Sequence, residues 1–309
     1  MTYYQLGLIG YPVSHSLSPR IQNAALQACG LEGDYSLFLL HPDDKQGLAG
    51  LLARVRSGEI TGLNVTIPHK QNVIALLDEL TPTAQAIGAV NVIYLREGKL
   101  IGDNTDAPGF LSDLKKSLTT VPLTGITLAL PAHPARHGRA GQVASVKTQR
   151  HGDSNALVLG AGGSARSIVY ALVNDGWNLT VAARRLEQAE QLVSSFSSYG
   201  IRGMEYSAIP ISTCHLLVNT TPIGMTPNTD ESPLPENITL PKDLFIYDLV
   251  YNPRETKLVR EARAQGLQAT TGLGMLIEQA ALSFEIWTGL EAPRETMRAA
   301  VEQSPVSNL

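Results

Sequence analysis

The stretch that decides the fold is Ala156-Leu157-Val158-Leu159-Gly160-Ala161-Gly162-Gly163-Ser164-Ala165-Arg166. Its four leading apolar residues predict a buried strand, and residues 167–173 predict the body of a helix. Between them, Gly160 and Gly162 allow a tight turn, and Ala165 takes the third small position of the G-x-G-x-x-G/A pattern. The amides that open such a helix point at a pyrophosphate. We therefore expect a dinucleotide-binding turn here, with an ordinary strand-to-helix connection as the alternative. Because about 150 residues precede it, another domain must come first.

The end of the next expected strand, residues 178–183, bears on which dinucleotide would bind. A protein that binds NAD places Asp or Glu there to hold the ribose 2′-hydroxyl. This chain has Arg184 and Arg185 instead. A guanidinium suits a 2′-phosphate through bidentate, charge-assisted hydrogen bonds. We therefore expect NADP, with Arg184 or Arg185 on the phosphate; the alternative is two solvated arginines that open a helix.

The composition is that of an ordinary globular protein with room for two domains. The chain has 309 residues, of which 43% are hydrophobic and 17% charged, and its net charge is −4. This charge gives no reason to expect a nucleic-acid partner. Cys29 and Cys214 have no C-x-x-C spacing, which fits a reducing compartment and argues against structural zinc. Without a signal-peptide pattern or an apolar span of about 18 residues, we expect a cytoplasmic protein that does not enter a membrane.

Strand and helix patterns alternate along the chain, which predicts an α/β fold. The expected strands cover 5–10, 35–40, 63–67, 178–183, 215–219 and 244–250, with a hairpin over 90–102. The expected helices cover 19–29, 44–56, 107–118, 186–198, 255–265 and 275–287. Residues 130–153 fit neither pattern and predict a linker-like insertion rich in Pro and Gly. Pro134 and Gly138 disfavour a helical metal site at His133 and His137, and the basic residues of the segment are either solvated or a docking tail.

Three polar clusters occupy the first part of the chain. Lys70 follows the strand in Asn64-Val65-Thr66-Ile67-Pro68-His69-Lys70, where open α/β sheets bind ligands, although a solvated lysine is the alternative. In residues 102–106, the alternative to a ligand site is that Asp103 or Thr105 only caps the following helix, but four polar residues are more than a cap needs. Ser18 precedes Pro19 and is the expected N-cap of the first helix. A helix start lined by hydroxyls also binds a carboxylate.

Five motifs in order resemble those of the shikimate dehydrogenase family, over nearly the whole chain outside the insertion. They are Ser16-Leu17-Ser18-Pro19; residues 64–70; Gly88-Ala89-Val90-Asn91 followed by 102–106; Gly160-Ala161-Gly162-Gly163; and Gly272-Leu273-Gly274-Met275 with Gln279. The resemblance implies that Ser16 and Ser18 hold the shikimate carboxylate, near Tyr251. It implies a lining of the hydroxyl-bearing ring by Thr66, Lys70, Asn91, Asp106 and Gln279. It implies cofactor contacts at residues 160–164, Thr220, Leu249, Gly272 and Met275.

The resemblance also implies two domains with the active site in the cleft between them. Residues 1–106 and 273–309 would form an α/β substrate domain, and 107–272 a Rossmann-type NADP domain that carries the insertion. The chain departs from the family in the 2′-phosphate clamp, because the usual Asn-Arg-Thr is Ala183-Arg184-Arg185 and a later arginine is Gln188. NADP preference is therefore expected, while its strictness is open.

The implied reaction is the reversible reduction of 3-dehydroshikimate to shikimate by NADPH, in the chorismate pathway to aromatic amino acids. The developing alkoxide needs a proton donor, for which Lys70 is the candidate, with Asp106 orienting it. A quinate or dual quinate/shikimate dehydrogenase is the nearest alternative, and Ser18 and Arg184 argue against it. Lys70 with Asp106 argues against a non-catalytic NADP-binding sensor. Beyond the small-molecule substrate, a homodimer is compatible with these features but not required by them.

Overall fold

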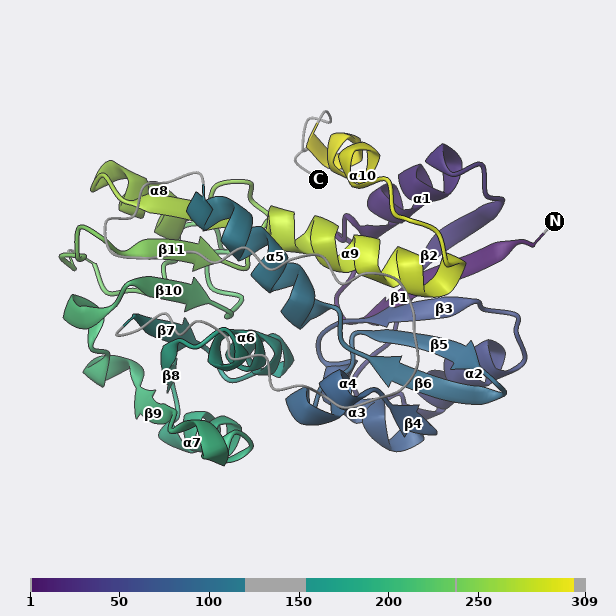
Figure 1. Cartoon of the computed structure of the whole chain (residues 1–309), viewed down its shortest axis with the longest axis horizontal. Coiled ribbons are helices and arrows are strands. Elements are labelled where there is room, and N and C mark those ends of the chain that lie inside the picture. Colours follow the sequence, from purple (N-terminus) through teal and green to yellow (C-terminus); the bar gives the residue numbers. More distant parts are fainter. Residues whose placement is uncertain (1, 120–153, 237, 303–309) are drawn as a thin grey trace.

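The computed structural model describes residues 2–119, 154–236 and 238–302. The insertion expected over 130–153, with its two histidines, lies outside these residues. In the described part of the chain, two six-stranded sheets lie side by side with helices around them (Figure 1). The α/β fold expected from the sequence is confirmed.

The first sheet has the strand order β2-β1-β3-β5-β6-β4. Its elements are β1 (Tyr4–Gly10), α1 (Ser18–Ala28), β2 (Gly33–Leu39), α2 (Lys45–Arg56), β3 (Gly62–Val65), α3 (His69–Asn72), η1 (Ile74–Leu76), β4 (Glu79–Leu80), α4 (Pro82–Ile87), β5 (Val92–Arg96) and β6 (Lys99–Asp103). Strands β1, β2 and β3 are parallel, and β5 is antiparallel to β3 and β6. The expected hairpin is confirmed, since Glu97 and Gly98 both have positive φ, as a tight two-residue turn requires. Therefore β3 and β6 end at the edge where β5 begins.

The second sheet is entirely parallel, with the order β12-β11-β10-β7-β8-β9. Its elements are β7 (Asn155–Leu159), α6 (Gly163–Asn174), β8 (Asn178–Ala183), α7 (Leu186–Ser194), η2 (Ser197–Tyr199), β9 (Arg202–Glu205), η3 (Tyr206–Ala208), η4 (Ile211–Thr213), β10 (Leu216–Asn219), β11 (Phe245–Asp248), α8 (Lys257–Ala264) and β12 (Gln268–Thr271). This is the doubly wound order, in which the chain changes direction between β7 and β10. Apolar residues fill both faces of β7, as expected for a central parallel strand.

Two helices pack together between the sheets: α5 (Asp106–Thr119) and α9 (Leu273–Thr288) (Figure 1). A methyl group on Gly109 would lie 2.8 Å from the backbone nitrogen of Gln279, and one on Gly274 would collide with the Asp113 carboxylate. The absence of side chains at both glycines therefore allows the two helix backbones to approach closely. The C-terminal helix α10 (Arg294–Glu302) packs against α1.

The expected cap of α1 is wrong, and the cap of α5 is neither of the two residues considered for it. Ser18 is the first residue of α1 instead of its N-cap, and the Oγ of Ser16 accepts a hydrogen bond from the Ser18 amide at 3.2 Å. At α5, the side chain of Asn104 accepts from the Ala107 amide at 3.2 Å, so Asn104 caps this helix in place of Asp103 or Thr105. In both cases a neighbouring side chain accepts the hydrogen bond of the free amide.

No helix in the described ranges combines the length and apolar character needed to cross a membrane.

Candidate active site

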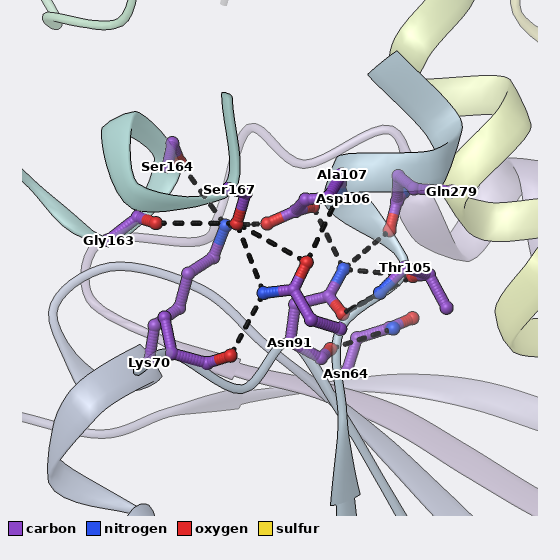
Figure 2. A network of polar contacts seen from close by, with 12 residues as sticks. Asn64, Lys70, Asn91, Thr105, Asp106, Ala107, Gly163, Ser164, Ser167 and Gln279 are labelled. Carbon is purple, nitrogen blue, oxygen red and sulfur yellow. Dashed lines mark hydrogen bonds and ion pairs between the residues drawn. The ribbon is translucent and has the colours of Figure 1, made fainter. Parts of the chain in front are cut away.

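A buried ion pair lies where the strands of the first sheet end. Lys70 sits in α3, shortly after β3, and Asp106 is the first residue of α5, after β6. The Lys70 Nζ donates to Oδ2 of Asp106 at 2.5 Å (Figure 2). The two residues are only 9% and 5% exposed. Because burial of an unpaired charge is costly, each side chain holds the other in place.

The amide of Asn91 fixes the other oxygen of Asp106. Asn91 precedes β5 at the same edge of the sheet, and its Nδ2 donates to Oδ1 of Asp106 at 2.8 Å. Its Oδ1 accepts from the Thr105 amide at 2.7 Å, which sets the orientation of the Asn91 side chain. Gln279, on α9, brings its Oε1 to 3.4 Å from the same Nδ2 (Figure 2). The structure thus brings Lys70, Asn91, Asp106 and Gln279 together.

Three further residues support this cluster and were not predicted as part of it. Asn64 donates to the carbonyl of Asn91 at 3.0 Å and to the Ser283 hydroxyl at 2.9 Å, while Tyr35 donates to the Asn64 Oδ1 at 2.9 Å. All three side chains are buried. The signal in the sequence is one polar residue at an inward position of a strand or helix that is otherwise apolar there, since buried polar groups need partners.

Hydroxyl groups gather at the N-terminus of α1. Burial raises the pKa of Tyr251, and a hydrogen bond with the Ser16 side chain acts in the opposite direction. Burial also raises the pKa of Tyr35, against the effect of a hydrogen bond with Ser18. Ser16 and Ser18 therefore each lie next to a tyrosine hydroxyl. Neutral donors at a helix N-terminus suit a carboxylate.

Thr66, partly buried, follows β3 at the same edge of the sheet, where its amide donates to the Ile9 carbonyl at 2.9 Å.

The glycine turn connects β7 to α6. Gly160 has φ of +109°, and a methyl group there would lie 2.5 Å from the Thr220 Oγ1, which itself donates to the Leu159 carbonyl at 2.6 Å. Gly162 caps α6 without a side-chain hydrogen bond, so among the described residues the capping position leaves the first amides of this helix available. These amides, which include that of Ser164, and the glycine backbone, which is open at Gly162, fit a pyrophosphate group. Ala161, partly buried, adds a small side chain to the turn.

The two arginines follow β8, the neighbour of β7. The Gly160 amide donates to the Ala182 carbonyl at 2.8 Å, so the end of β8 lies beside the glycine turn. Arg184 and Arg185 are both exposed. Among the described residues, neither forms an ion pair with an acidic side chain. Both guanidinium groups therefore have donors for a phosphate next to the turn, which fits the 2′-phosphate of NADP.

The remaining predicted cofactor contacts lie beyond β11. The Leu249 amide donates to the Asn219 carbonyl at 2.9 Å, and Gly272 caps α9 where a methyl group would collide with the Leu249 carbonyl. Met275, in the first turn of α9, is 7% exposed and packs against the core of the second sheet. These residues share the edge of the sheet with the glycine turn, because parallel strands all end at one edge.

A buried carboxylate, that of Asp248, connects the segments that follow β10 and β11. Asp248 is fully buried and accepts hydrogen bonds from the Asn219 side chain at 2.8 Å, the Thr256 hydroxyl at 2.6 Å and the Val250 amide at 3.1 Å. Burial raises its pKa to about 6, although these hydrogen bonds act in the opposite direction. Asp248 therefore anchors the segments that carry Thr220 and Leu249.

The two halves of the site touch each other at the start of α6. The Lys70 Nζ donates to the Ser164 Oγ at 3.2 Å (Figure 2). Asn104 donates to the Ser167 Oγ at 3.0 Å. The helix that follows the glycine turn is thus in contact with the ion pair of the first sheet. Among the described residues, no group of three or more His, Cys, Asp and Glu side chains is arranged to hold a metal ion.

Comparison with known protein families covers most of the chain. Residues 8–93 match the shikimate dehydrogenase substrate-binding domain, 142–254 match shikimate/quinate 5-dehydrogenase, and 272–302 match the shikimate 5′-dehydrogenase C-terminal domain. The shikimate dehydrogenase (NADP+) of Methanopyrus kandleri is 38% identical over 305 residues, which cover 96% of this chain and 94% of that protein.

Solved structures agree with this assignment. Shikimate 5-dehydrogenase from Thermus thermophilus, in complex with NADP(H) and shikimate, superimposes with a TM-score of 0.78 at 36% identity, over 96% of this chain and 98% of that one. Quinate dehydrogenase from Corynebacterium glutamicum, in complex with NAD, gives a TM-score of 0.79 at 29% identity, over 97% and 99%. From its sequence motifs, its two-sheet architecture and these relatives, the chain belongs to the shikimate dehydrogenase family.

Proposed function

We propose that the protein catalyses the reversible, NADPH-dependent reduction of 3-dehydroshikimate to shikimate. The observation that carries this proposal is the contact of the Lys70–Asp106 ion pair with the helix that opens at the glycine turn, at 3.2 Å from Lys70 Nζ to Ser164 Oγ. A proton donor and a dinucleotide turn in contact suit the reduction of a carbonyl group. The relatives from Methanopyrus kandleri and Thermus thermophilus are shikimate dehydrogenases, which supports the same reaction.

On the cofactor side, the chain would hold NADP along the carboxyl edge of the second sheet. The backbone from Gly160 to Ser164 would bind the pyrophosphate, and Arg184 with Arg185 the 2′-phosphate. The nicotinamide end would lie near Thr220, Leu249, Gly272 and Met275. Bound in this way, NADPH would supply the hydride.

On the substrate side, the hydroxyls of Ser16, Ser18 and Tyr251 would bind the carboxylate of the ring. Thr66, Lys70, Asn91, Asp106 and Gln279 would line its hydroxyl groups. As the carbonyl carbon gains a hydride, its oxygen takes a proton from Nζ of Lys70, so that an N–H bond breaks and an O–H bond forms. Asp106 keeps the ammonium in place because Asn91 in turn holds the carboxylate.

The direct test is an assay of the purified protein with shikimate or quinate as substrate, and NADP or NAD as cofactor. The absorbance of the reduced nicotinamide reports turnover. We expect the highest kcat/KM with shikimate and NADP. Higher kcat/KM with quinate and NAD would instead assign the protein to quinate oxidation, and no turnover with any pair would favour an NADP-binding sensor.

We also propose that residues 1–106 and 273–309 form the substrate domain and 107–272 the cofactor domain. The separate sheets before α5 and after it support this division.

We further propose a cytoplasmic location, which the two free cysteines support. Light scattering on the purified protein would distinguish a homodimer from a monomer.

A further inference from the structure

The ammonium group of Lys70 has three N–H donors to place. One goes to Asp106 Oδ2 at 2.5 Å and a second to Ser164 Oγ at 3.2 Å. In the described part of the chain, no third side chain accepts from Lys70. Since the three donors of an ammonium point in fixed relative directions, two bonds determine where the third points. One donor therefore remains for an oxygen atom of the substrate.

Ser164 reaches Lys70 from the opposite half of the molecule. It is the second residue of α6, directly after the glycine turn, and is partly buried. Its neighbour Gly163 faces the aliphatic stem of Lys70, because a methyl group on Gly163 would lie 3.1 Å from the Lys70 Cβ and 3.3 Å from its Cδ. The stem and the head of Lys70 thus both lie against the first turn of α6.

The same helix is attached to the first half of the chain at two more points. Arg166 donates to the Ile87 carbonyl at 3.2 Å, and the Ser167 hydroxyl accepts from Asn104 at 3.0 Å. These contacts hold α6 at a defined distance from Lys70 without touching its ammonium. They separate two effects: docking of the helix, which involves Ser167, and orientation of Lys70, which involves Ser164.

We propose that Ser164 is a positioning residue for Lys70, whose hydroxyl fixes the direction of the lysine N–H that faces the substrate. This proposal rests on the proposed function, in which Lys70 gives a proton to the carbonyl oxygen. Asp106 alone leaves the ammonium free to rotate about the single ion pair, whereas the second bond to Ser164 stops this rotation. The residue that orients the proton donor is therefore part of the turn that would bind the cofactor.

The test uses three single variants of the full chain, assayed with shikimate and NADP. In Ser164→Ala, kcat should fall about tenfold, because a hydrogen bond to a charged group is lost, while both KM values stay within about twofold. Ser164→Thr retains the hydroxyl and should recover most of the wild-type kcat. Ser167→Ala is the matched control, with the same change one turn further along α6, and its kcat should stay within about twofold of the wild type.

A double variant shows whether Ser164 acts through Lys70. In a Lys70→Ala background, Ser164→Ala should cause no further fall in kcat, since there is no ammonium left to orient. The proposal is overturned if Ser164→Ala keeps wild-type kcat, if its loss persists in the Lys70→Ala background, or if Ser167→Ala causes an equal loss. A Lys70→Ala variant with full turnover would overturn the proposed role of Lys70 itself, and the role of Ser164 with it.

Discussion

Lys70 and Asp106, 36 positions apart in the sequence, form a buried ion pair in which Nζ and Oδ2 are 2.5 Å apart. Replacement of Lys70 by Ala should lower kcat by about a thousandfold, because general acid–base catalysis contributes about 10²- to 10⁴-fold. NADP binding should stay nearly unchanged, since the glycine turn and the arginines lie on the other sheet. Steady-state kinetics and a fluorescence titration with NADPH measure the two quantities.

Lys99 provides the control for this change. It is an exposed lysine, paired with Glu79, on the first sheet. Lys99→Ala should keep wild-type kcat, because its ion pair is solvent-exposed. A Lys70→Ala variant with more than about a tenth of the wild-type kcat would contradict proton transfer by Lys70.

Removal of the two arginines should change the choice of cofactor. In the variant Arg184→Ala/Arg185→Ala, the KM for NADP should rise at least about tenfold, while the KM for NAD should change little, because only NADP loses a phosphate partner. Arg202→Ala is the control. This exposed arginine is the first residue of β9, so it lies away from the carboxyl ends of the strands, which Arg184 and Arg185 follow. An equal rise in the KM values for NADP and NAD would show that the arginines do not bind the 2′-phosphate.

Replacement of Gly160 by Ala should lower stability, whereas replacement of Gly162 by Ala should weaken NADPH binding. Gly160→Ala should lower the free energy of unfolding by about 1–2 kcal/mol, because a left-handed conformation is strained for alanine. At Gly162 no atom lies within 4 Å of an added methyl group, and φ is −85°. Gly162→Ala should therefore fold with wild-type stability in urea, yet bind NADPH more weakly, since the methyl group would meet the pyrophosphate. Unchanged NADPH affinity in Gly162→Ala would contradict binding of the pyrophosphate at this turn.

The buried carboxylate of Asp248 should make stability depend on pH. Its pKa is about 6 in the folded protein, against an ordinary value of 3.8. The folded state therefore keeps a proton that the unfolded state has lost, so this contribution to stability is present below about pH 4 and is lost as pH rises through about 6. The loss amounts to about 3 kcal/mol at neutral pH. In urea titrations at pH 4.5 and pH 7, the wild type should lose stability relative to Asp248→Asn as pH rises. A constant difference between the two proteins would contradict the raised pKa.

The sequence predicts the strands of the first sheet more completely than those of the second, because only β4 was missed in the first, whereas β9 and β12 were not expected in the second. The glycine turn and the alternating strands and helices around it follow local patterns, and β7, β8 and α6 lie within a few residues of their expected bounds. The short elements α3 and α4 were not predicted, because a helix of one or two turns has too few residues for a periodic pattern.

In the site, the residues expected to contact substrate were predictable, whereas the supporting roles of Asn64, Tyr35 and Ser283 were not, although Asn64 lies within a motif. Asn64, Tyr35 and Ser283 act through contacts between distant segments, which no local pattern encodes. The contact between Lys70 and Ser164 depends on how the two sheets pack, so it also requires the three-dimensional structure. The cap of α1 was assigned to the wrong residue, and the cap of α5 is neither of the two residues considered for it, because several polar side chains near each helix start compete for the same amides.

Helix α9 carries Met275, packed against the second sheet, and Gln279, beside Asn91 of the first. One helical turn, about 6 Å along the axis, separates the two residues. The insertion of a single residue between them would rotate one relative to the other by about 100°, so that both could not face their present neighbours. A chain that keeps both contacts must therefore keep the number of residues between positions 275 and 279.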